Sequence, residues 1–269
     1  MPKRRFKSMA YLLDAKQEDK VLVCIPAYNE SASISDTLIA IKEAIPEHFD
    51  VLVIDDGSED FTSDICRMRG VKVISHIFNM GYGAALKTAY KYATENNYHY
   101  VIQLDADGQH DVANITPLYQ RLTADDDPAI VIGSRFLEGA VSFHVPVYKK
   151  FVINFFRTLI KLTGHVKITD PTSGLQGIRR DAFSYYARYR KFAIDYPDAN
   201  MIIQMAMNGY SICEIPAIMH PRYAGESMHS GIIKPFMYII KMMLSVFVVA
   251  LRETSRNRKI HYKKPKEKH

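Results

Sequence analysis

The sequence contains no tryptophan and, in 269 residues, only three cysteines: Cys24, Cys66 and Cys213. The cysteines are odd in number, far apart and mostly within apolar segments, so they predict neither a disulfide framework nor a metal-thiolate site. They are typical of reduced core residues. A secretory signal is also missing, because no apolar stretch follows the basic N-terminus Met1–Lys7. We therefore expect the protein to remain inside the cell.

Two common nucleotide-binding loops are absent as well. No Gly-Lys-Ser or Gly-Lys-Thr sequence is present, which argues against a P-loop. The pair Gly81 and Gly83 does not follow the first apolar segment, and Leu86 stands where a Rossmann fingerprint needs its third glycine. The sequence therefore disfavours both P-loop NTPases and dinucleotide oxidoreductases.

Excess charge of one sign is missing from most of the chain. The net charge is +6, and the eight Lys/Arg and two Glu from Arg252 onward account for all of it. The nearly neutral remainder argues against a nucleic-acid partner. The basic tail instead favours an anionic surface such as the inner face of a membrane.

Five short apolar segments alternate with segments of helical character, which predicts an α/β protein with a doubly wound, mostly parallel sheet. The expected strands are Val21–Ile25, Val51–Ile54, Val71–Ile74, Tyr100–Leu104 and Ala129–Ile132. The expected helices are Ile34–Ile45, with Ser31 or Ser33 as its cap, Thr62–Arg69, Gly83–Asn96 and Val112–Leu122.

A polar cluster follows each expected strand. The clusters are Tyr28–Glu30, Asp55–Ser58, Asn79–Gly83, Asp105–Gln109, and Ser134 with Arg135. In open α/β sheets the carboxyl ends of parallel strands meet at one edge, where ligands bind. We therefore expect all five clusters to contribute to one site.

Asp105 and Asp107 stand one residue apart at the end of the fourth expected strand. A hard cation such as Mg²⁺ takes one or two carboxylates and fills its other positions with water and phosphate oxygens. A lone Asp-X-Asp is more often a solvated turn before a helix. Its position among the other polar clusters favours a metal-diphosphate site here.

The ordered motifs resemble those of family 2 glycosyltransferases with the GT-A fold, over about residues 20–225. The motifs that carry the resemblance are Ile25–Glu30, Val53–Ser58, Asn79–Gly83, Leu104–His110 and Gly133–Arg135. Two later motifs, Asp170–Arg179 and Arg222–Met228, resemble the polyprenyl-phosphate branch that contains dolichol-phosphate mannosyltransferase.

The resemblance implies a role for each group of residues. The donor nucleotide would contact Pro26, Tyr28, Glu30, Asp55, Asp56, Asn79, Gly81 and Asp105. A divalent metal, Mg²⁺ or Mn²⁺, would be held by Asp105, Asp107 and Gln109. The acceptor and other phosphates would contact Arg135, Ser173, Arg222 and Ser227. The catalytic residues would be Asp107, Asp170, Asp198 and Arg135.

The need for a general base depends on the acceptor. A sugar hydroxyl needs a base, whereas a lipid phosphate is already ionised and attacks directly. Asp170, Asp195 and Asp198 are the candidates, although Asp198 also suits the cap of the expected helix Met201–Met207. Asp170 precedes Pro171 and also suits a turn, but we expect it to line the acceptor phosphate site.

The segment Ile232–Leu251 is strongly apolar but is interrupted by Lys234, Pro235 and Lys241. It is too broken for the roughly 20 apolar residues of a spanning helix, so we expect an amphipathic helix in the membrane interface. An oligomer interface or a small membrane subunit is the alternative. The aromatic segment Val147–Leu162 is a second candidate for membrane contact, or simply core.

These expectations divide the chain into a basic extension (1–19), a GT-A catalytic domain (20–228), an apolar helix (229–252) and a basic tail (253–269). The leading hypothesis is a metal-dependent inverting hexosyl or N-acetylhexosaminyl transferase at the cytoplasmic membrane face. It would move a sugar from a nucleotide sugar, expected to be UDP-linked, to undecaprenyl-type phosphate for cell-surface glycan synthesis or modification. The alternatives are transfer to a polysaccharide hydroxyl with Asp198 as base and, more remotely, a non-catalytic binding module.

Overall fold

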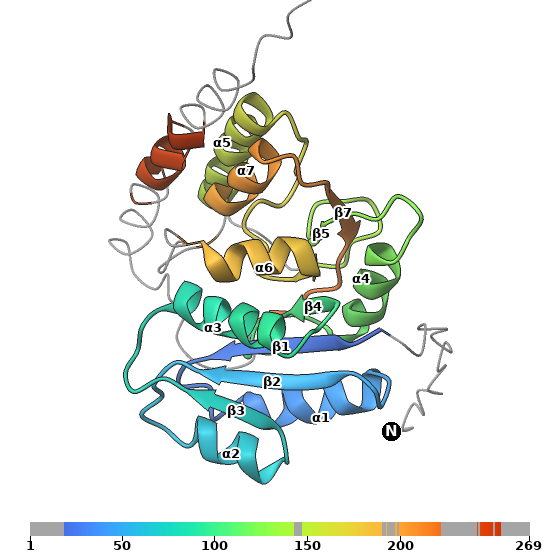
Figure 1. Ribbon diagram of the computed structural model, residues 1–269, viewed down its shortest axis with the longest axis vertical. Coiled ribbons are helices and arrows are strands. Elements are labelled where there is room, and N and C mark those ends of the chain that lie inside the picture. Colours follow the sequence, from blue (N-terminus) through green and yellow to red (C-terminus); the bar gives the residue numbers. More distant parts are fainter. Residues whose placement is uncertain are drawn as a thin grey trace, which may run out of the picture.

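The computed structural model describes residues 19–142, 147–189, 192, 197, 199–221, 241, 243–249 and 251–253. These residues form one sheet of seven strands in the order β3-β2-β1-β4-β6-β5-β7, flanked by helices (Figure 1). The strands are β1 (Val21–Ala27), β2 (Asp50–Asp55), β3 (Lys72–Ser75), β4 (Tyr100–Gln103), β5 (Ile130–Ser134), β6 (Gln176–Arg179) and β7 (Ile212–Pro216). The helices are α1 (Ile34–Ala44), α2 (Thr62–Met68), α3 (Tyr82–Glu95), the 3₁₀ turn η1 (Val112–Asn114), α4 (Ile115–Leu122), α5 (Val147–Gly164), α6 (Arg180–Arg188) and α7 (Ala199–Met207).

The predicted α/β class and mostly parallel sheet are confirmed, and all five expected strands are present. Strands β1 to β4 are parallel, and β5 and β7 run in the same direction. Strand β6 is inserted between β4 and β5 and is antiparallel to both. We did not predict β6 or β7, because each is short and interrupts its apolar residues with polar ones, as Glu214 does in β7.

The central strand β1 is buried along its whole length because helices cover both faces of the sheet. Its alternate residues enter two separate cores. Leu22 and Cys24 pack with α3, α6 and α7, whereas Val23 and Ile25 pack with α1 and α4. Cys24 and Cys66 are buried, as expected for core residues, and Cys213 is half-buried.

The start of α1 corrects one expectation. Ser33 is the residue before the helix, but its side chain makes no capping hydrogen bond to a helical N–H. Its hydroxyl instead donates to the Glu30 carboxylate at 2.9 Å. Ser33 therefore ties the helix start to the loop after β1.

The described residues 241, 243–249 and 251–253 are helical, and we call them the C-terminal helix. This helix contacts α7 through polar side chains. Asn200 donates to the Ser245 hydroxyl at 2.7 Å, and Gln204 and Asn208 donate to the buried Glu253 carboxylate at 3.3 Å each. Figure 1 shows it in red beside α5 and α7.

The outer side of the C-terminal helix is apolar. Its exposed apolar residues are Met243, Leu244, Phe247, Val248 and Leu251. Helix α5 likewise exposes Phe151, Phe155 and Leu162 while burying Phe156 and Ile160. Within the described part of the chain, no helix combines the length and hydropathy required to cross a bilayer.

Candidate functional site

The five polar clusters lie at one rim of the sheet, as predicted. Each follows the carboxyl end of one of the parallel strands β1 to β5, and β7 ends at the same rim. Because β6 is antiparallel, the loop Asp170–Leu175 enters the sheet there, between the loops after β4 and β5. The later motif Asp170–Arg179 is thus brought to the clusters that precede it in the sequence.

Tyr82 and His110 lie on either side of Asp105. Tyr82, at the start of α3, donates its hydroxyl proton to Asp105 Oδ1 at 2.9 Å. The backbone N–H of Asp105 donates to His110 Nδ1 at 3.0 Å. His110 Nε2 then carries the ring proton and lies 3.7 Å from Asp105 Oδ2, which is too far for a hydrogen bond. The Tyr82 hydroxyl therefore orients a carboxylate that is about a third exposed.

Asp107 is nearly buried, and its Oδ1 accepts the backbone N–H of Gln109 at 3.0 Å. The structure brings Asp105, Asp107 and Gln109 together in one short turn at the end of β4. Across the described residues there is no cluster of three or more His, Cys, Asp or Glu side chains suited to a metal. Two carboxylates and an amide oxygen nevertheless fit a hard cation that completes its shell with water and phosphate oxygens.

The loops after β1 and β2 are tied together on the expected nucleotide side. Asn29, which has a positive φ of 54°, donates its backbone N–H to Ser58 Oγ at 3.0 Å. Asp55 Oδ1 accepts the N–H of Ser58 at 3.0 Å. Tyr28 is exposed at this rim, whereas Asp55 and Asp56 are buried.

Asp56 organises the loop that leads into α3. Its Oδ1 accepts the N–H of Met80 at 3.0 Å, and its Oδ2 accepts that of Gly81 at 2.8 Å. Its Oδ1 also lies 2.6 Å from His76 Nδ1. Both carboxylate oxygens of Asp56 are therefore already engaged within the protein.

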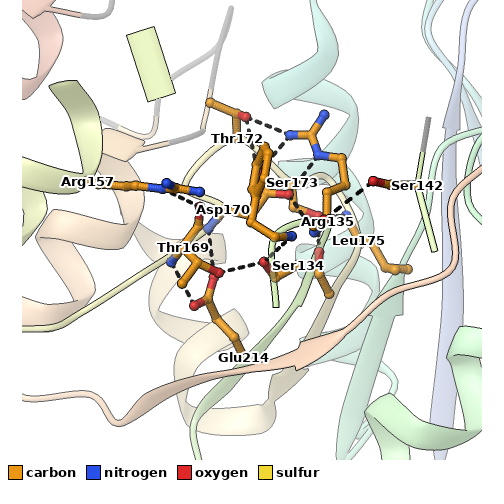
Figure 2. Close-up of polar contacts among 12 residues, drawn as sticks. Ser134, Arg135, Ser142, Arg157, Thr169, Asp170, Thr172, Ser173, Leu175 and Glu214 are labelled. Carbon is orange, nitrogen blue, oxygen red and sulfur yellow. Dashed lines mark hydrogen bonds and ion pairs between the residues drawn. The ribbon is translucent and has the colours of Figure 1, made fainter. Parts of the chain in front are cut away.

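Arg135 and Asp170 form a two-pronged ion pair at the other end of the site (Figure 2). Arg135 Nε and Nη2 each donate to an Asp170 oxygen at 2.7 Å, and the Asp170 side chain is completely buried. Such a pair occupies both carboxylate oxygens and fixes the guanidinium. Asp170 is therefore better placed to hold Arg135 than to remove a proton from a substrate.

Two residues that belong to none of the predicted motifs support this ion pair. Glu214 accepts the backbone N–H groups of Thr169 at 2.7 Å and of Asp170 at 2.8 Å (Figure 2). Burial raises the pKa of Glu214, and the two N–H groups partly oppose that shift. Arg157 of α5 donates to the Thr169 carbonyl at 2.6 Å.

Ser173 is buried, and its hydroxyl donates to the Gly133 carbonyl at 2.6 Å. It therefore joins the loop before β6 to β5, beside Arg135. The remaining predicted residues Asp195, Asp198, Arg222 and Ser227 lie outside the described residues.

The chain is similar to known proteins over most of its length. The model of the family described as glycosyl transferase family 2 matches residues 22–186. An undecaprenyl-phosphate mannosyltransferase from Micrococcus luteus is 30% identical over 223 residues, which cover 79% of this chain and 88% of the relative. A polyprenol monophosphomannose synthase from Mycolicibacterium smegmatis is 27% identical over 222 residues, which cover 79% of this chain and 82% of the relative.

Solved structures agree on the fold. Glucosyl-3-phosphoglycerate synthase from Mycobacterium tuberculosis, crystallised with Mn²⁺, UDP and glucosyl-3-phosphoglycerate, superposes with a TM-score of 0.64 at 17% identity. The match covers 88% of this chain and 81% of that one. The site residues from Tyr28 to Ser173 lie within the range 22–186 that matches the family model, and Glu214 lies beyond it.

Proposed function

We propose, from the premise that the chain belongs to glycosyl transferase family 2 and is a GT-A glycosyltransferase, that it transfers one sugar from a nucleotide sugar to a polyprenyl phosphate. The relatives named above support this acceptor, since both names specify a polyprenyl phosphate or its product. The nucleotide, expected to be UDP, and the sugar stay predictions from the sequence. The inverting course of the reaction is part of the same proposal.

One observation carries the proposal: a carboxylate turn and an anchored arginine are joined by a single short loop. Gly174 lies so close to Asp105 that a Cβ there would be 3.0 Å from its Oδ2. Four residues earlier in that loop, Asp170 binds Arg135. The rim thus has an anionic turn suited to a metal-bound diphosphate next to a cation suited to a second phosphate.

The transfer that these groups favour is a direct displacement. An ionised phosphate oxygen of the lipid attacks the anomeric carbon, and the bond from that carbon to the donor diphosphate breaks with inversion. The nucleoside diphosphate leaves with the electron pair, and no proton has to move. A divalent ion, when bound by Asp105, Asp107 and Gln109, would stabilise the charge on the departing diphosphate.

The arrangement around Asp170 supports a phosphate acceptor over a hydroxyl acceptor. A hydroxyl would need a base, and Asp170 is buried and bound to Arg135 through both oxygens. Arg135 is held by a partner that also fixes its direction, as phosphate recognition requires. Asp107 and Arg135 are accordingly proposed to act on the charges of the two phosphates, and Asp170 through Arg135.

The C-terminal helix supports attachment to a membrane surface, which we propose is the cytoplasmic face. The helix directs Ser245 and Glu253 toward α7, and five of its apolar residues are exposed, which is unusual for a helix on a water-exposed surface. The tail that follows it is basic, which suits an anionic lipid surface. A small membrane subunit or a second copy of the chain is the alternative cover for this apolar face.

A donor screen with lipid analysis tests the proposal. The purified protein is incubated with Mg²⁺ or Mn²⁺, undecaprenyl phosphate and either UDP- or GDP-linked hexoses and N-acetylhexosamines. We expect one donor to give a lipid-linked monosaccharide by mass spectrometry. Absence of this product with every donor, with sugar appearing on a polysaccharide hydroxyl instead, would contradict the proposal. Loss of that second activity in Asp198→Asn would identify the base.

A further inference from the structure

The imidazole of His76 lies between two elements of the donor side, and none of the roles assigned above includes it. His76 follows β3, and only 10% of its side chain is exposed. Its Nδ1 is 2.6 Å from Asp56 Oδ1, at the end of β2. Its Nε2 is 2.9 Å from Thr88 Oγ1, in α3. Asp56 is the titratable group that contacts the ring, and α3 contributes an uncharged hydroxyl.

The hydrogen bonds around His76 can be counted proton by proton. The single hydroxyl proton of Thr88 goes to the carbonyl of Ala84, at 3.0 Å. Thr88 Oγ1 must therefore accept a hydrogen bond from the ring, which places a proton on His76 Nε2.

The other ring nitrogen also requires a proton. Asp56 accepts backbone N–H groups through both of its oxygens, as an ionised carboxylate does. A contact of 2.6 Å between Asp56 Oδ1 and His76 Nδ1 then needs a proton, and the ring supplies it. This hydrogen-bond pattern calls for a proton on each ring nitrogen, which is the imidazolium form.

We propose that His76 is a positively charged positioning residue, which holds Asp56 and, through Asp56, the Met80–Gly81 amides at the start of α3. The inference rests on the proposed function, because this loop belongs to the expected donor site. It explains why a histidine suits the position. An unpaired Asp56 carboxylate would repel an incoming donor diphosphate, whereas the ion pair has no net charge.

The loop after β3, which His76 supports, is closely packed against the loop after β2. A Cβ at Gly57, whose φ is +72°, would lie 2.5 Å from the Phe78 carbonyl carbon and 2.7 Å from the Asn79 nitrogen. The loop after β3 therefore packs directly on the backbone of the loop after β2. A change in the His76–Asp56 pair is transmitted to the Met80–Gly81 amides at the loop's end.

The charge of the ring can be tested without any assay of activity. Correlation of the ring nitrogens and protons of ¹⁵N-labelled protein by NMR distinguishes an imidazolium from either neutral tautomer. We expect an imidazolium for His76 at neutral pH, with its signals assigned by their absence from the His76→Asn spectrum. A neutral His76 ring would overturn the proposal.

The positioning role is tested by kinetics in the same variant. His76→Asn keeps an N–H near the Nδ1 position but removes the charge, so we expect the KM for the nucleotide sugar to rise about tenfold. The value of kcat and the KM for the lipid phosphate should change little. The control variant His48→Asn should leave all three kinetic constants unchanged. An unchanged donor KM would refute the positioning role.

Two further measurements cover the remaining outcomes. If no donor supports transfer, the proposed function fails, and hydrogen exchange of residues 79–83 still decides this inference: exchange should be faster in His76→Asn than in the wild type. If His76→Asn does not fold, Thr88→Val removes the acceptor of the Nε2 proton, and the ring signals that change in that variant identify His76. We expect one set of imidazolium signals to change in Thr88→Val, and a spectrum with no changed ring signals would count against the proton assignment.

Discussion

Gly174 is the residue at which the loop before β6 touches the carboxylate turn. Because its Cβ position is 3.0 Å from the Tyr82 hydroxyl and from Asp105 Oδ2, any side chain there must displace the Asp105 carboxylate. We expect Gly174→Ala to lower turnover about tenfold, since small displacements of reacting groups are costly.

Gly209 provides the matched control for Gly174. Nothing lies within 4 Å of its Cβ position, but its φ is +82°. We expect Gly209→Ala to cost about 1 kcal/mol of stability in urea unfolding, with turnover unchanged. Equal effects of the two substitutions on turnover would show that Gly174 acts only through stability.

The proposed role of Asp107 as a metal ligand can be tested directly. We expect Asp107→Asn to weaken Mn²⁺ binding in the presence of UDP by at least about tenfold, because it removes a charged oxygen ligand. Isothermal titration calorimetry measures this without turnover. The exposed Asp125→Asn should bind Mn²⁺ as the wild type does, and equal affinity in all three proteins would contradict the assignment.

Among single residues, the sequence was sufficient to predict those that lie next to a strand and its motif. Asp105 and Asp107 stand one residue apart at the end of one strand, and Arg135 follows another strand, so the pattern of strands predicted that they share a rim. Glu214 and His76 were missed because their partners, Asp170 and Asp56, are 44 and 20 residues away in the chain. No periodicity or motif connects positions that meet only after folding.

Among the elements, the C-terminal helix departs most from the pattern of a water-soluble protein. We expect the double variant Leu244→Ser and Phe247→Ser to bind phosphatidylglycerol vesicles more than tenfold more weakly, because burying each side chain is worth about 2 kcal/mol. Flotation measures binding. Met68→Ser, which removes an even more exposed apolar side chain from α2, should bind normally.

The same double variant distinguishes a lipid surface from a second protein copy as the partner of the apolar face of the C-terminal helix. If vesicle binding is unchanged and the oligomeric state determined by light scattering changes instead, the apolar face contacts another copy of the chain. The division into an extension, a catalytic domain, an apolar helix and a tail stays a prediction.

Element type was predictable wherever the apolar pattern was continuous. The expected helix Gly83–Asn96 and the observed α3 differ by one residue at each end. Strand β6 could not be predicted in the same way, because its position depends on pairing with β4 and β5. The antiparallel insertion is a property of the assembled sheet, and four residues contain too little information to specify it.

For the whole molecule, ion-paired carboxylates at the rim of the sheet opposite the site contribute to the loss of stability in acid. Arg179, at the end of β6, binds Asp181 and Asp127. Its hydrogen bonds hold the pKa of Asp181 below the usual value of 3.8. A lowered carboxyl pKa contributes stability that is present above the unfolded pKa and is lost as the pH falls through the folded one.

We therefore expect the free energy of unfolding in urea to decrease below about pH 4, with Asp181 contributing less than about 1 kcal/mol because its side chain is half exposed. Asp181→Asn should be less stable than the wild type at neutral pH and equally stable in strong acid. A constant difference between the two proteins at every pH would show that the ion pair is not responsible.

The short loop between Asp170 and Gly174 has a consequence for how this protein can change over generations. One end of the loop sets the direction of Arg135 and the other borders Asp105. If Asp105 and Arg135 serve the donor and the acceptor as proposed, a lineage that inserts or deletes a residue there would alter the recognition of both substrates in a single event. The segment after β7 is bound to the donor turn as well, because the backbone N–H of His220 donates to the Gln109 carbonyl at 2.8 Å. New acceptors would therefore be more accessible to this scaffold through changes in α5.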